Sequence, residues 1–380
     1  MFASVASRKQ FAAFGPNGTG KTESIKDFAR LIGRQPVVFN CSPEITAAVA
    51  QILGKAIAAL NADHYMIVFD EYNRILPKVI VSCQSMIEDT YKNYMTFVPC
   101  FISFNPSFKN KAFDYSTYNA VEFKVPELKP IIESFVADQG FIEAEKFAGW
   151  IDNAFKDCKT LKMQEQYDFG LRAIKHSIML AGTIWQEDKK VPQEECIGKA
   201  LRLCVKGRLI DEHKSFLESS LRKMGVPAVT TEENAALTLA QLIKFRHACG
   251  LYSKTNNHRT MIDQVARSEG YEVQRIDFNA HTPDQLFGSQ IKKQWHDGVL
   301  TSTLRNVAKT NPKTIIVCQG EVHHLKYEPL NTAFDQNKIL VLMSGERIIV
   351  PAETRFVVET NSCKNASPAV VSRIAFVSID

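Results

Sequence analysis

The spacing of apolar residues in the first 105 positions switches repeatedly between a strand-like and a helix-like pattern. Residues 65–69 are a continuous apolar run of strand length, which is typical of a strand buried on both faces of a parallel sheet, and residues 98–104 predict another buried strand. Shorter runs predict strands at 10–14 and 36–40, and helical spacing predicts helices at about 25–32, 49–60 and 79–94. Strands that alternate with helices predict a parallel, doubly wound α/β sheet, which binds ligands at the carboxyl ends of its strands.

The pattern becomes helical between residues 127 and 224, and a second α/β pattern begins at about residue 232. Helix-spaced apolar residues occupy 141–155, 169–184 and 194–221. The second pattern predicts strands at 248–252, 271–278, 313–318, 355–359 and 374–377, with a hairpin of 339–343 and 348–350 that turns at Ser344-Gly345. We therefore divide the chain into an α/β core at 1–126, a helical lid at 127–230 and a second α/β core at 231–380 that lacks a lid.

Composition and charge narrow the classes of partner. A length of 380 residues allows two or three domains, each with its own core. The 46 basic and 41 acidic residues leave a net charge of +5 that is spread evenly, which argues against a nucleic-acid partner. The nine cysteines lack paired C-x-x-C spacing and are typical of reduced core thiols in a cytosolic protein. No apolar run reaches membrane-spanning length, so we expect no membrane partner.

A phosphate-binding motif follows the first predicted strand. Residues 15–22 read GPNGTGKT and fit the pattern G-x-x-x-x-G-K-[ST]. In such a loop, glycines let backbone N–H groups turn toward phosphate oxygens, and the following helix adds its positive N-terminal end. Lys21 would reach the outer phosphates and Thr22 would place its hydroxyl on Mg²⁺. The residues expected to bind the nucleotide are Gly15, Pro16, Asn17, Gly18, Thr19, Gly20, Lys21 and Thr22.

Two acidic residues and one amide close the neighbouring predicted strands. Asp70 follows the apolar run at 65–69, so it would hold Mg²⁺, and Glu71 would orient or deprotonate an attacking water. An Asp-Glu pair in isolation is usually a solvated strand end, but here it follows a phosphate loop. Asn105 could contact the γ-phosphate or the water, and a simple Asn-Pro turn is its alternative role.

Several strings in this sequence resemble dynein heavy chains, whose motor is a ring of AAA+ modules. The strings similar to the first module lie at 15–24, 38–42 and 69–75, with the sensor strand at 101–106 and the start of the lid helix at 167–173. Those similar to the second module lie at 286–288, 295–300, 342–346 and 366–373. The resemblance implies a P-loop fold of the AAA+ type with a helical lid, followed by a second, degenerate AAA+ α/β module.

The resemblance also implies roles for particular residues, with ATP and Mg²⁺ as ligands. Lys21 and Thr22 would serve the phosphates and the metal, and Asp70 and Glu71 would be the metal-holding and catalytic carboxylates. Asn105 would be the first sensor, Arg172 the second sensor, and Arg373 an arginine finger supplied by the second module. Without the resemblance, Arg373 would be interpreted as a surface arginine before a strand.

Some positions depart from the family pattern. Residues 253–260, where the second phosphate loop is expected, contain neither glycine nor a lysine in register. Gln319 replaces the expected aspartate and offers no charge to Mg²⁺. In the first module, residues 107–111 replace a glycine-rich run, and the usual arginine-proline pair is absent near 121–124. We therefore expect the first nucleotide site to be intact and binding at the second to be doubtful.

The predicted function is that of a dynein-like motor ATPase segment. The chain holds about one and two-thirds of the six modules of a dynein ring, and it lacks a heptad stretch for a stalk. It begins just before the first loop, which looks like a clipped start. The implied partners are the remaining ring modules and, through parts outside this chain, dynein intermediate and light chains and microtubules. The expected location is the cytoplasm and cytoskeleton, with axonemal or ciliary as the alternative.

Two other functions fit parts of the sequence. A nucleotide-binding scaffold without turnover, or a fragment of a divergent dynein, would account for the degenerate second site. A midasin-like remodelling ATPase is a further AAA+ alternative, which the dynein-type strings disfavour. The intact Lys21, Asp70, Glu71 and Arg373 favour an enzyme.

Overall fold

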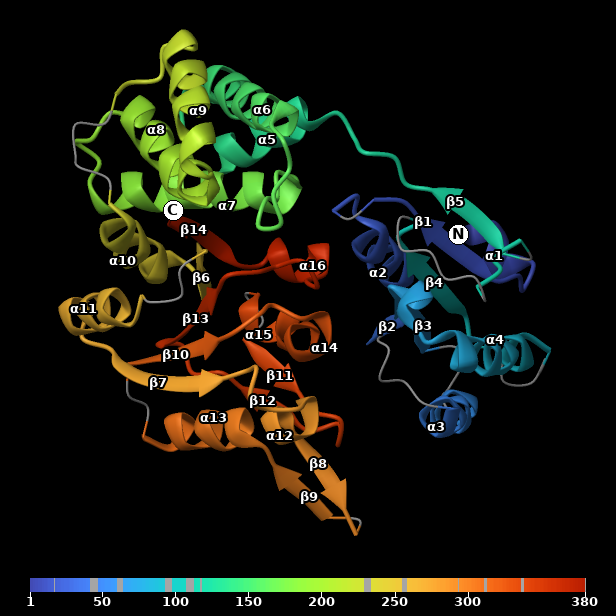
Figure 1. The fold of residues 1–380 in the computed structure, drawn as a ribbon. Coiled ribbons are helices and arrows are strands. Elements are labelled where there is room, and N and C mark those ends of the chain that lie inside the picture. Colours follow the sequence, from blue (N-terminus) through green and yellow to red (C-terminus); the bar gives the residue numbers. More distant parts are fainter. Residues whose placement is uncertain are drawn as a thin grey trace. The chain divides into compact units, whose positions relative to one another are not determined.

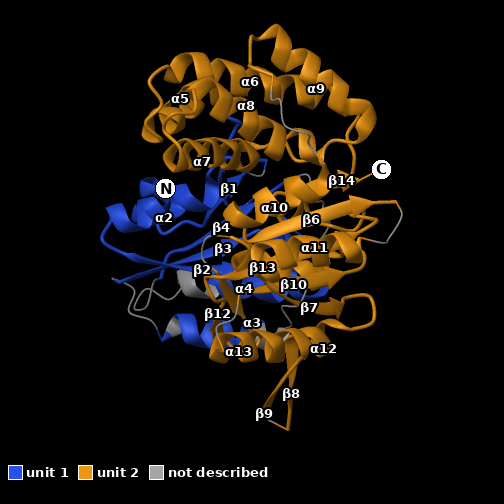
Figure 2. Cartoon of the chain, turned by 90° about the vertical axis from the view of Figure 1, so that its left-hand side faces the viewer, with its two compact units in different colours: residues 1–126 blue, residues 127–380 orange. Residues whose placement is uncertain are grey.

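The computed structural model describes residues 1–16, 18–41, 47–59, 64–92, 98–106, 113–116, 118–228, 234–254, 258–292, 294–310, 313–335 and 338–379. They form two compact units, unit 1 at Met1–Pro126 and unit 2 at Glu127–Asp380 (Figure 2). Among the described residues, no helix combines the length and the apolar character needed to cross a membrane.

Unit 1 is built on a five-stranded parallel sheet with the strand order β2-β3-β4-β1-β5 (Figure 1). Its strands are β1 (Phe11–Phe14), β2 (Gln35–Asn40), β3 (Tyr65–Asp70), β4 (Cys100–Phe104) and β5 (Asn119–Glu122). The predicted parallel α/β sheet is confirmed. The edge strand β5 was missed because all four of its side chains are exposed and so carry no apolar pattern.

Helices cover both faces of this sheet, since successive side chains of a strand point to opposite faces. Met66 and Val68 of β3 pack in one apolar cluster with Phe28 of α2. Ile67 and Phe69 pack on the other face with residues of α3 and α4, such as Ile80. The helices of unit 1 are α1 (Phe2–Ala6), α2 (Lys21–Leu31), α3 (Ala47–Ala58) and α4 (Pro77–Lys92), with a 3₁₀ turn η1 (Tyr72–Arg74).

The second α/β core, in unit 2, repeats the topology of the first. Its parallel sheet has the order β14-β6-β13-β10-β7. The strands are β6 (Ala248–Ser253), β7 (Glu272–Asp277), β10 (Thr314–Gln319), β13 (Thr354–Thr360) and β14 (Ala375–Ile379). In both sheets the first strand in chain order lies between the fourth and the fifth, and the second strand forms an edge. Positions in the two cores can therefore be matched through strand register.

Every regular element in the described residues of the lid segment is a helix or a 3₁₀ turn, as expected. Its helices are α5 (Leu128–Asp138), α6 (Ala144–Thr160), α7 (Leu171–Glu187), α8 (Gln193–Cys204) and α9 (Asp211–Lys223), with the turn η2 (Lys206–Arg208). The apolar pattern at 194–221 is therefore two helices. The turn η2 separates them, and its buried Arg208 donates from the guanidinium to the carbonyl oxygens of Asp168 and Ile374.

The lid shares one hydrophobic cluster with the second core, so both belong to one compact unit. Phe155 and Leu201 of the lid belong to the same buried cluster as Cys249 and Val357 of the second sheet. Gln166 also donates a hydrogen bond of 3.1 Å to Ser378 Oγ. The predicted boundary between lid and second core at 230–231 lies outside the described residues and stays a prediction.

Two antiparallel hairpins complete unit 2. The predicted one pairs β11 (Ile339–Val341) with β12 (Arg347–Ile349), and the other pairs β8 (Gly288–Ile291) with β9 (Gln294–Asp297). The second was not predicted, because its strands are short, polar and largely exposed. The other elements are α10 (Ala235–Phe245), α11 (Arg259–Glu269), α12 (Pro283–Phe287), α13 (Val299–Thr310), α14 (His324–Tyr327), η3 (Glu328–Leu330), α15 (Asn331–Phe334) and α16 (Pro368–Val371).

Truncation of a lid side chain in the shared cluster should destabilise unit 2. Phe155 is 1% exposed, so Phe155→Ala removes buried apolar surface and leaves a cavity. We expect the free energy of unfolding to fall by about 3–5 kcal/mol in urea denaturation. Ile142→Ala is the matched control, since Ile142 is 87% exposed and should change stability little. Equal effects of the two substitutions would contradict the shared core.

Candidate functional site

The loop after β1 is held by the two strands that flank it. The Gly15 N–H donates to the Phe104 carbonyl at 3.2 Å, and the Phe123 N–H donates to Phe14 at 2.7 Å. Gly15 has φ +153°, and a Cβ there would lie 2.2 Å from the Phe123 carbonyl oxygen. Glycine is therefore required at this position by both conformation and space.

The rest of the loop turns through left-handed backbone into α2. Gly18 and Gly20 have φ values of +77° and +82°, which glycine adopts without steric cost. Thr19 Oγ1 donates to the Pro16 carbonyl at 2.9 Å. Asn17 lies outside the described residues. The result is a glycine-rich turn that ends at the N-terminus of an 11-residue helix, as the motif predicts.

Lys21 is the first residue of α2 and its ammonium group lies against the loop. Nζ donates to the carbonyl oxygens of Gly15 and Pro16, each at 2.8 Å, and the side chain is buried. Burial lowers the pKa of Lys21, while the carboxylates of Glu71 and Asp70 act in the opposite direction. The loop therefore holds a buried cationic group close to two acidic residues.

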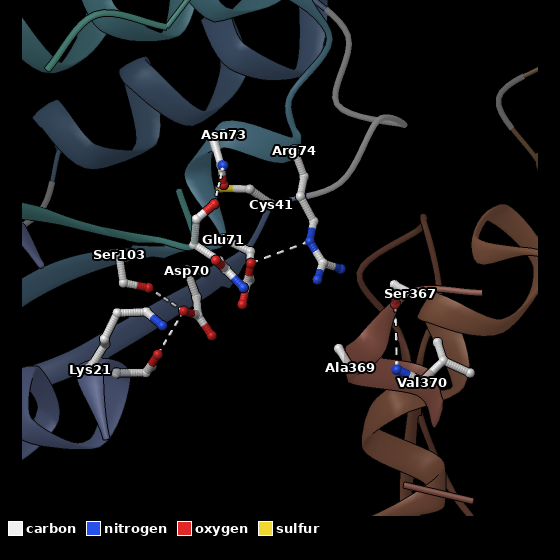
Figure 3. Close-up of polar contacts among 12 residues, drawn as sticks. Lys21, Cys41, Asp70, Glu71, Asn73, Arg74, Ser103, Ser367, Ala369 and Val370 are labelled. Carbon is white, nitrogen blue, oxygen red and sulfur yellow. Dashed lines mark hydrogen bonds and ion pairs between the residues drawn. The ribbon is translucent and has the colours of Figure 1, made fainter. Parts of the chain in front are cut away.

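Asp70 ends β3 and accepts two hydroxyl hydrogen bonds on one oxygen. Thr22 Oγ1 donates to Asp70 Oδ1 at 2.6 Å. Ser103 Oγ of β4 donates to the same atom, and Figure 3 shows Ser103 beside Asp70. The structure thus brings together the two predicted metal-holding residues. Ser103 was not predicted. A hydroxyl in the otherwise apolar run Cys100–Phe104 was the available signal, and only the strand register places it beside Asp70.

Glu71 follows Asp70 and adopts an unusual backbone conformation. Its φ is +55°, in the left-handed region that few residues other than glycine occupy. An ion pair of 3.3 Å between Arg74 Nε and Glu71 Oε2 closes the turn η1, and the Arg74 N–H donates to the Glu71 carbonyl (Figure 3). The turn and the ion pair hold the Glu71 carboxylate just beyond the end of β3, where Figure 3 shows it near Asp70. Such strained residues cluster at functional sites.

Two further residues support the strand ends. Cys41 follows β2, and its N–H donates to the Asp70 carbonyl at 2.8 Å. Burial first, and then the carboxylate of Asp70, raises the pKa of the Cys41 thiol well above its usual value, so the thiol stays neutral. Asn73 Nδ2 donates to the Asn105 carbonyl at 2.8 Å. Asn105 follows β4, which lies between β3 and β1, and its sensor role stays a prediction.

The two predicted arginines lie in unit 2, where the structure brings them together. Arg172, at the start of α7, donates to Ser372 Oγ at 2.5 Å. The neighbouring Arg373 donates to Asp335 Oδ2 at 2.7 Å and to the Ala369 carbonyl at 2.8 Å. Burial, and then the charge of Arg373, lowers the pKa of Arg172. Contact of either arginine with the phosphate loop stays a prediction.

Sequence reasoning missed the residues that hold these arginines. Arg246 donates from a guanidinium nitrogen to the Arg373 carbonyl at 2.9 Å, and Asp335 binds the Arg373 guanidinium. Both holders come from segments far from 366–373 in the chain, so no local pattern marks them. The structure therefore provides a fixed pair of guanidinium groups within unit 2.

The described residues of unit 1 fit a magnesium–nucleotide ligand. Oxygen atoms are the ligands that Mg²⁺ prefers, and Thr22 Oγ1 and Asp70 Oδ1 lie 2.6 Å apart. The buried Lys21 and the N-terminus of α2 supply positive charge on the same loop. Glu71 supplies a second carboxylate beside the first.

A family model described as "Hydrolytic ATP binding site of dynein motor region" matches residues 1–101 and 99–273. This chain belongs to the dynein motor-region family. The match confirms the predicted dynein resemblance over the first core, the lid and the start of the second core.

Named dynein heavy chains are similar to almost the whole chain. The ciliary dynein beta chain of Heliocidaris crassispina is 28% identical over 97% of this chain. Human dynein axonemal heavy chain 9 is 29% identical over 97%, and mouse cytoplasmic dynein 2 heavy chain 1 is 27% identical over 96%. The matched region spans 9%, 9% and 10% of these relatives. The chain therefore spans about a tenth of the length of the relatives it matches.

Two glycines of the loop provide a matched test of its geometry. Gly15→Ala should destabilise unit 1 by more than about 2 kcal/mol. The new Cβ would clash with the Phe123 carbonyl, and alanine would also be strained at the positive φ of this position. Gly18→Ala should lower the free energy of unfolding by only about 1–2 kcal/mol, which is the cost of a left-handed backbone for alanine. No atom lies within 4 Å of a Cβ built at Gly18. Denaturant unfolding of each variant measures the difference. Equal losses would contradict the close approach at Gly15.

Proposed function

We propose that this chain is part of a dynein heavy-chain-type motor and that unit 1 binds ATP with Mg²⁺ and hydrolyses it. The observation that carries the proposal is the 2.6 Å hydrogen bond between Thr22 Oγ1 and Asp70 Oδ1. It joins the end of the phosphate loop to the carboxyl end of β3, where Glu71 follows. Hydrolysis of a nucleoside triphosphate depends mainly on positioning and charge stabilisation, and this arrangement would contribute to both.

The loop and α2 would bind the triphosphate. Backbone N–H groups at Gly18, Thr19 and Gly20 and the positive end of α2 suit phosphate oxygens. Lys21 would bind the outer phosphates through its buried ammonium group. Thr22 and Asp70 would hold Mg²⁺, which neutralises phosphate charge when it is bound.

Glu71 would act on the attacking water. The water oxygen would bond to the γ-phosphorus as the bond from that phosphorus to the β–γ bridging oxygen breaks, which yields ADP and phosphate. Glu71 would orient this water and accept its proton, a role that suits a carboxylate fixed beside the metal-holding Asp70. The ion pair with Arg74 holds the Glu71 side chain in one direction. Asn105, at the end of the adjacent strand, would orient the water or the γ-phosphate.

Arg172 and Arg373 would contact the nucleotide from unit 2. In this assignment unit 1 and the lid form the first AAA+ module, Arg172 is its second sensor, and Arg373 is the finger of the second module. The bond from Arg172 to Ser372 supports the idea that both guanidinium groups move as one. Their engagement with the γ-phosphate would therefore couple hydrolysis to a movement of the whole of unit 2.

The wider role rests on the relatives. Their names include ciliary, axonemal and cytoplasmic dyneins, which supports a cytoskeletal location and microtubule-based movement. Because this chain spans about a tenth of their length, the partners would be further ring modules. Intermediate and light chains and microtubules would bind through other parts of a complete heavy chain.

Removal of the proposed catalytic carboxylate should separate binding from hydrolysis. Glu71→Gln keeps the shape of the side chain but cannot accept a proton, so we expect kcat for ATP to fall about 10²–10⁴-fold. Affinity for ATP should change little, because Lys21, Thr22 and Asp70 remain. Steady-state phosphate release and equilibrium ATP binding measure the two effects. The exposed Glu145→Gln on α6 is the control. Equal turnover by wild type and Glu71→Gln would favour the scaffold without turnover.

Removal of the proposed finger should slow hydrolysis with little loss of binding. Arg373→Ala removes a charge that would stabilise the transferring phosphoryl group, and a finger of this kind contributes about 10³–10⁵-fold in rate. Arg347→Ala is the control, because it removes one positive charge from an exposed position of β12, as Arg373→Ala does from its own position. It should leave kcat unaltered. The check is single-turnover hydrolysis with the chain in excess over ATP and at a concentration above its Kd. An unaltered rate in Arg373→Ala would show that this side chain does not act in the reaction.

A further inference from the structure

The shared topology identifies which residues of the second core stand at the positions of Asp70 and Ser103. In unit 1, β3 and β4 pair Phe69 with Ile102, which puts the next residues, Asp70 and Ser103, across from each other. In unit 2, the equivalent strands β10 and β13 pair Gln319 with Glu359. Gln319 therefore corresponds to Asp70, and Glu359 corresponds to Ser103.

The two cores carry their carboxylate on different strands. Unit 1 has an acid on β3 with a hydroxyl beside it, whereas unit 2 has an amide on β10 with an acid beside it. Gln319 Nε2 donates to Glu359 Oε2 at 2.7 Å, so the amide turns its donor group toward the carboxylate (Figure 1 shows both strands). A donor nitrogen cannot ligate Mg²⁺. The Glu359 side chain is only 7% exposed.

The second oxygen of Glu359 binds the start of a helix. The His258 N–H donates to Glu359 Oε1 at 3.0 Å, and His258 is the N-cap of the 11-residue α11. Its counterpart in unit 1 is Gly20, the N-cap of α2 at the end of the phosphate loop. Backbone N–H groups at such a helix N-terminus are the donors that phosphate groups use. The carboxylate of Glu359 thus already binds one backbone N–H group of this kind.

We propose that Glu359 takes the place of a nucleotide phosphate in the second core, so that this core is self-ligated and does not take up ATP. Both carboxylate oxygens already accept hydrogen bonds, one from the helix N-cap and one from Gln319. A phosphate group that entered would meet a buried negative charge, and it would have to displace that charge from its donors. The chain therefore binds one nucleotide, in unit 1, and the second core keeps its structure without a ligand.

The decisive binding experiment uses the full chain with Lys21→Ala, which weakens the site in unit 1. Calorimetric titration with Mg-ATP and with Mg-ADP should give one nucleotide per wild-type chain and none per Lys21→Ala chain. Two nucleotides bound per wild-type chain, or one bound by the Lys21→Ala chain with unweakened affinity, would overturn the self-ligated core. Failure of the proposed hydrolysis in unit 1 would instead appear as normal binding without turnover, so the two outcomes are distinguishable.

A second experiment tests whether the carboxylate stands in for phosphate. In the Lys21→Ala background, Glu359→Ser should lower the melting temperature of unit 2, because the N-cap and Gln319 lose their acceptor. Inorganic phosphate at tens of millimolar should restore part of this loss relative to chloride at equal ionic strength, and it should not affect the parent. The exposed Glu353→Ser is the control. The proposal that Glu359 takes the place of phosphate would be wrong if the melting temperature is unchanged, or if phosphate does not reverse the decrease in melting temperature. If Glu359→Ser does not fold, the nucleotide titration decides.

Discussion

The parallel pairing of β3, β4 and β1 is the constraint on which the candidate site depends. Because all three strands run in the same direction, their carboxyl ends meet at one edge of the sheet. That edge carries the phosphate loop from β1, Asp70 and Glu71 from β3, and Asn105 from β4. The hydrogen bonds that Asp70 accepts from Thr22 and Ser103 then tie the loop, the helix and both strands together. A shift in register would separate the carboxylate from both hydroxyls.

A second constraint is the apolar cluster that joins the lid to the second core. It makes a lid residue, Arg172, and a second-core residue, Arg373, neighbours in one compact unit. Two guanidinium groups repel each other, and burial adds to the cost, so their pairing needs compensation. Asp335 supplies an opposite charge, and Arg246 anchors the backbone of Arg373. The lid and the second core therefore pack as one compact unit.

The two cores show that fold and site chemistry are separable. Both sheets have the same strand order, because buried apolar strands and covering helices determine the topology. The polar residues at the strand ends differ. In unit 1 they leave a glycine loop, a buried lysine and two carboxylates side by side, whereas in unit 2 Glu359 binds the helix N-cap and Gln319 directly. The residues that would bind a ligand at the carboxyl ends of the strands can therefore change while the apolar core of the sheet is kept.

The sequence by itself determined the features that local rules control. Apolar periodicity predicted the buried strands, the helical lid and the hairpin after Ile339, and glycine spacing identified the loop before Lys21. The dynein strings identified the family. Local periodicity carries no signal for the exposed edge strand β5 or for the short polar hairpin of β8 and β9.

Only the tertiary structure decided which distant side chains meet. Ser103 beside Asp70, Asp335 beside Arg373 and Glu359 beside Gln319 each join residues that are 33 to 40 positions apart. These contacts depend on strand register and on packing between segments. The spacing of residues along one segment predicts neither of them. The sequence could name the chemical groups of the first site, but their partners depend on how the strands align.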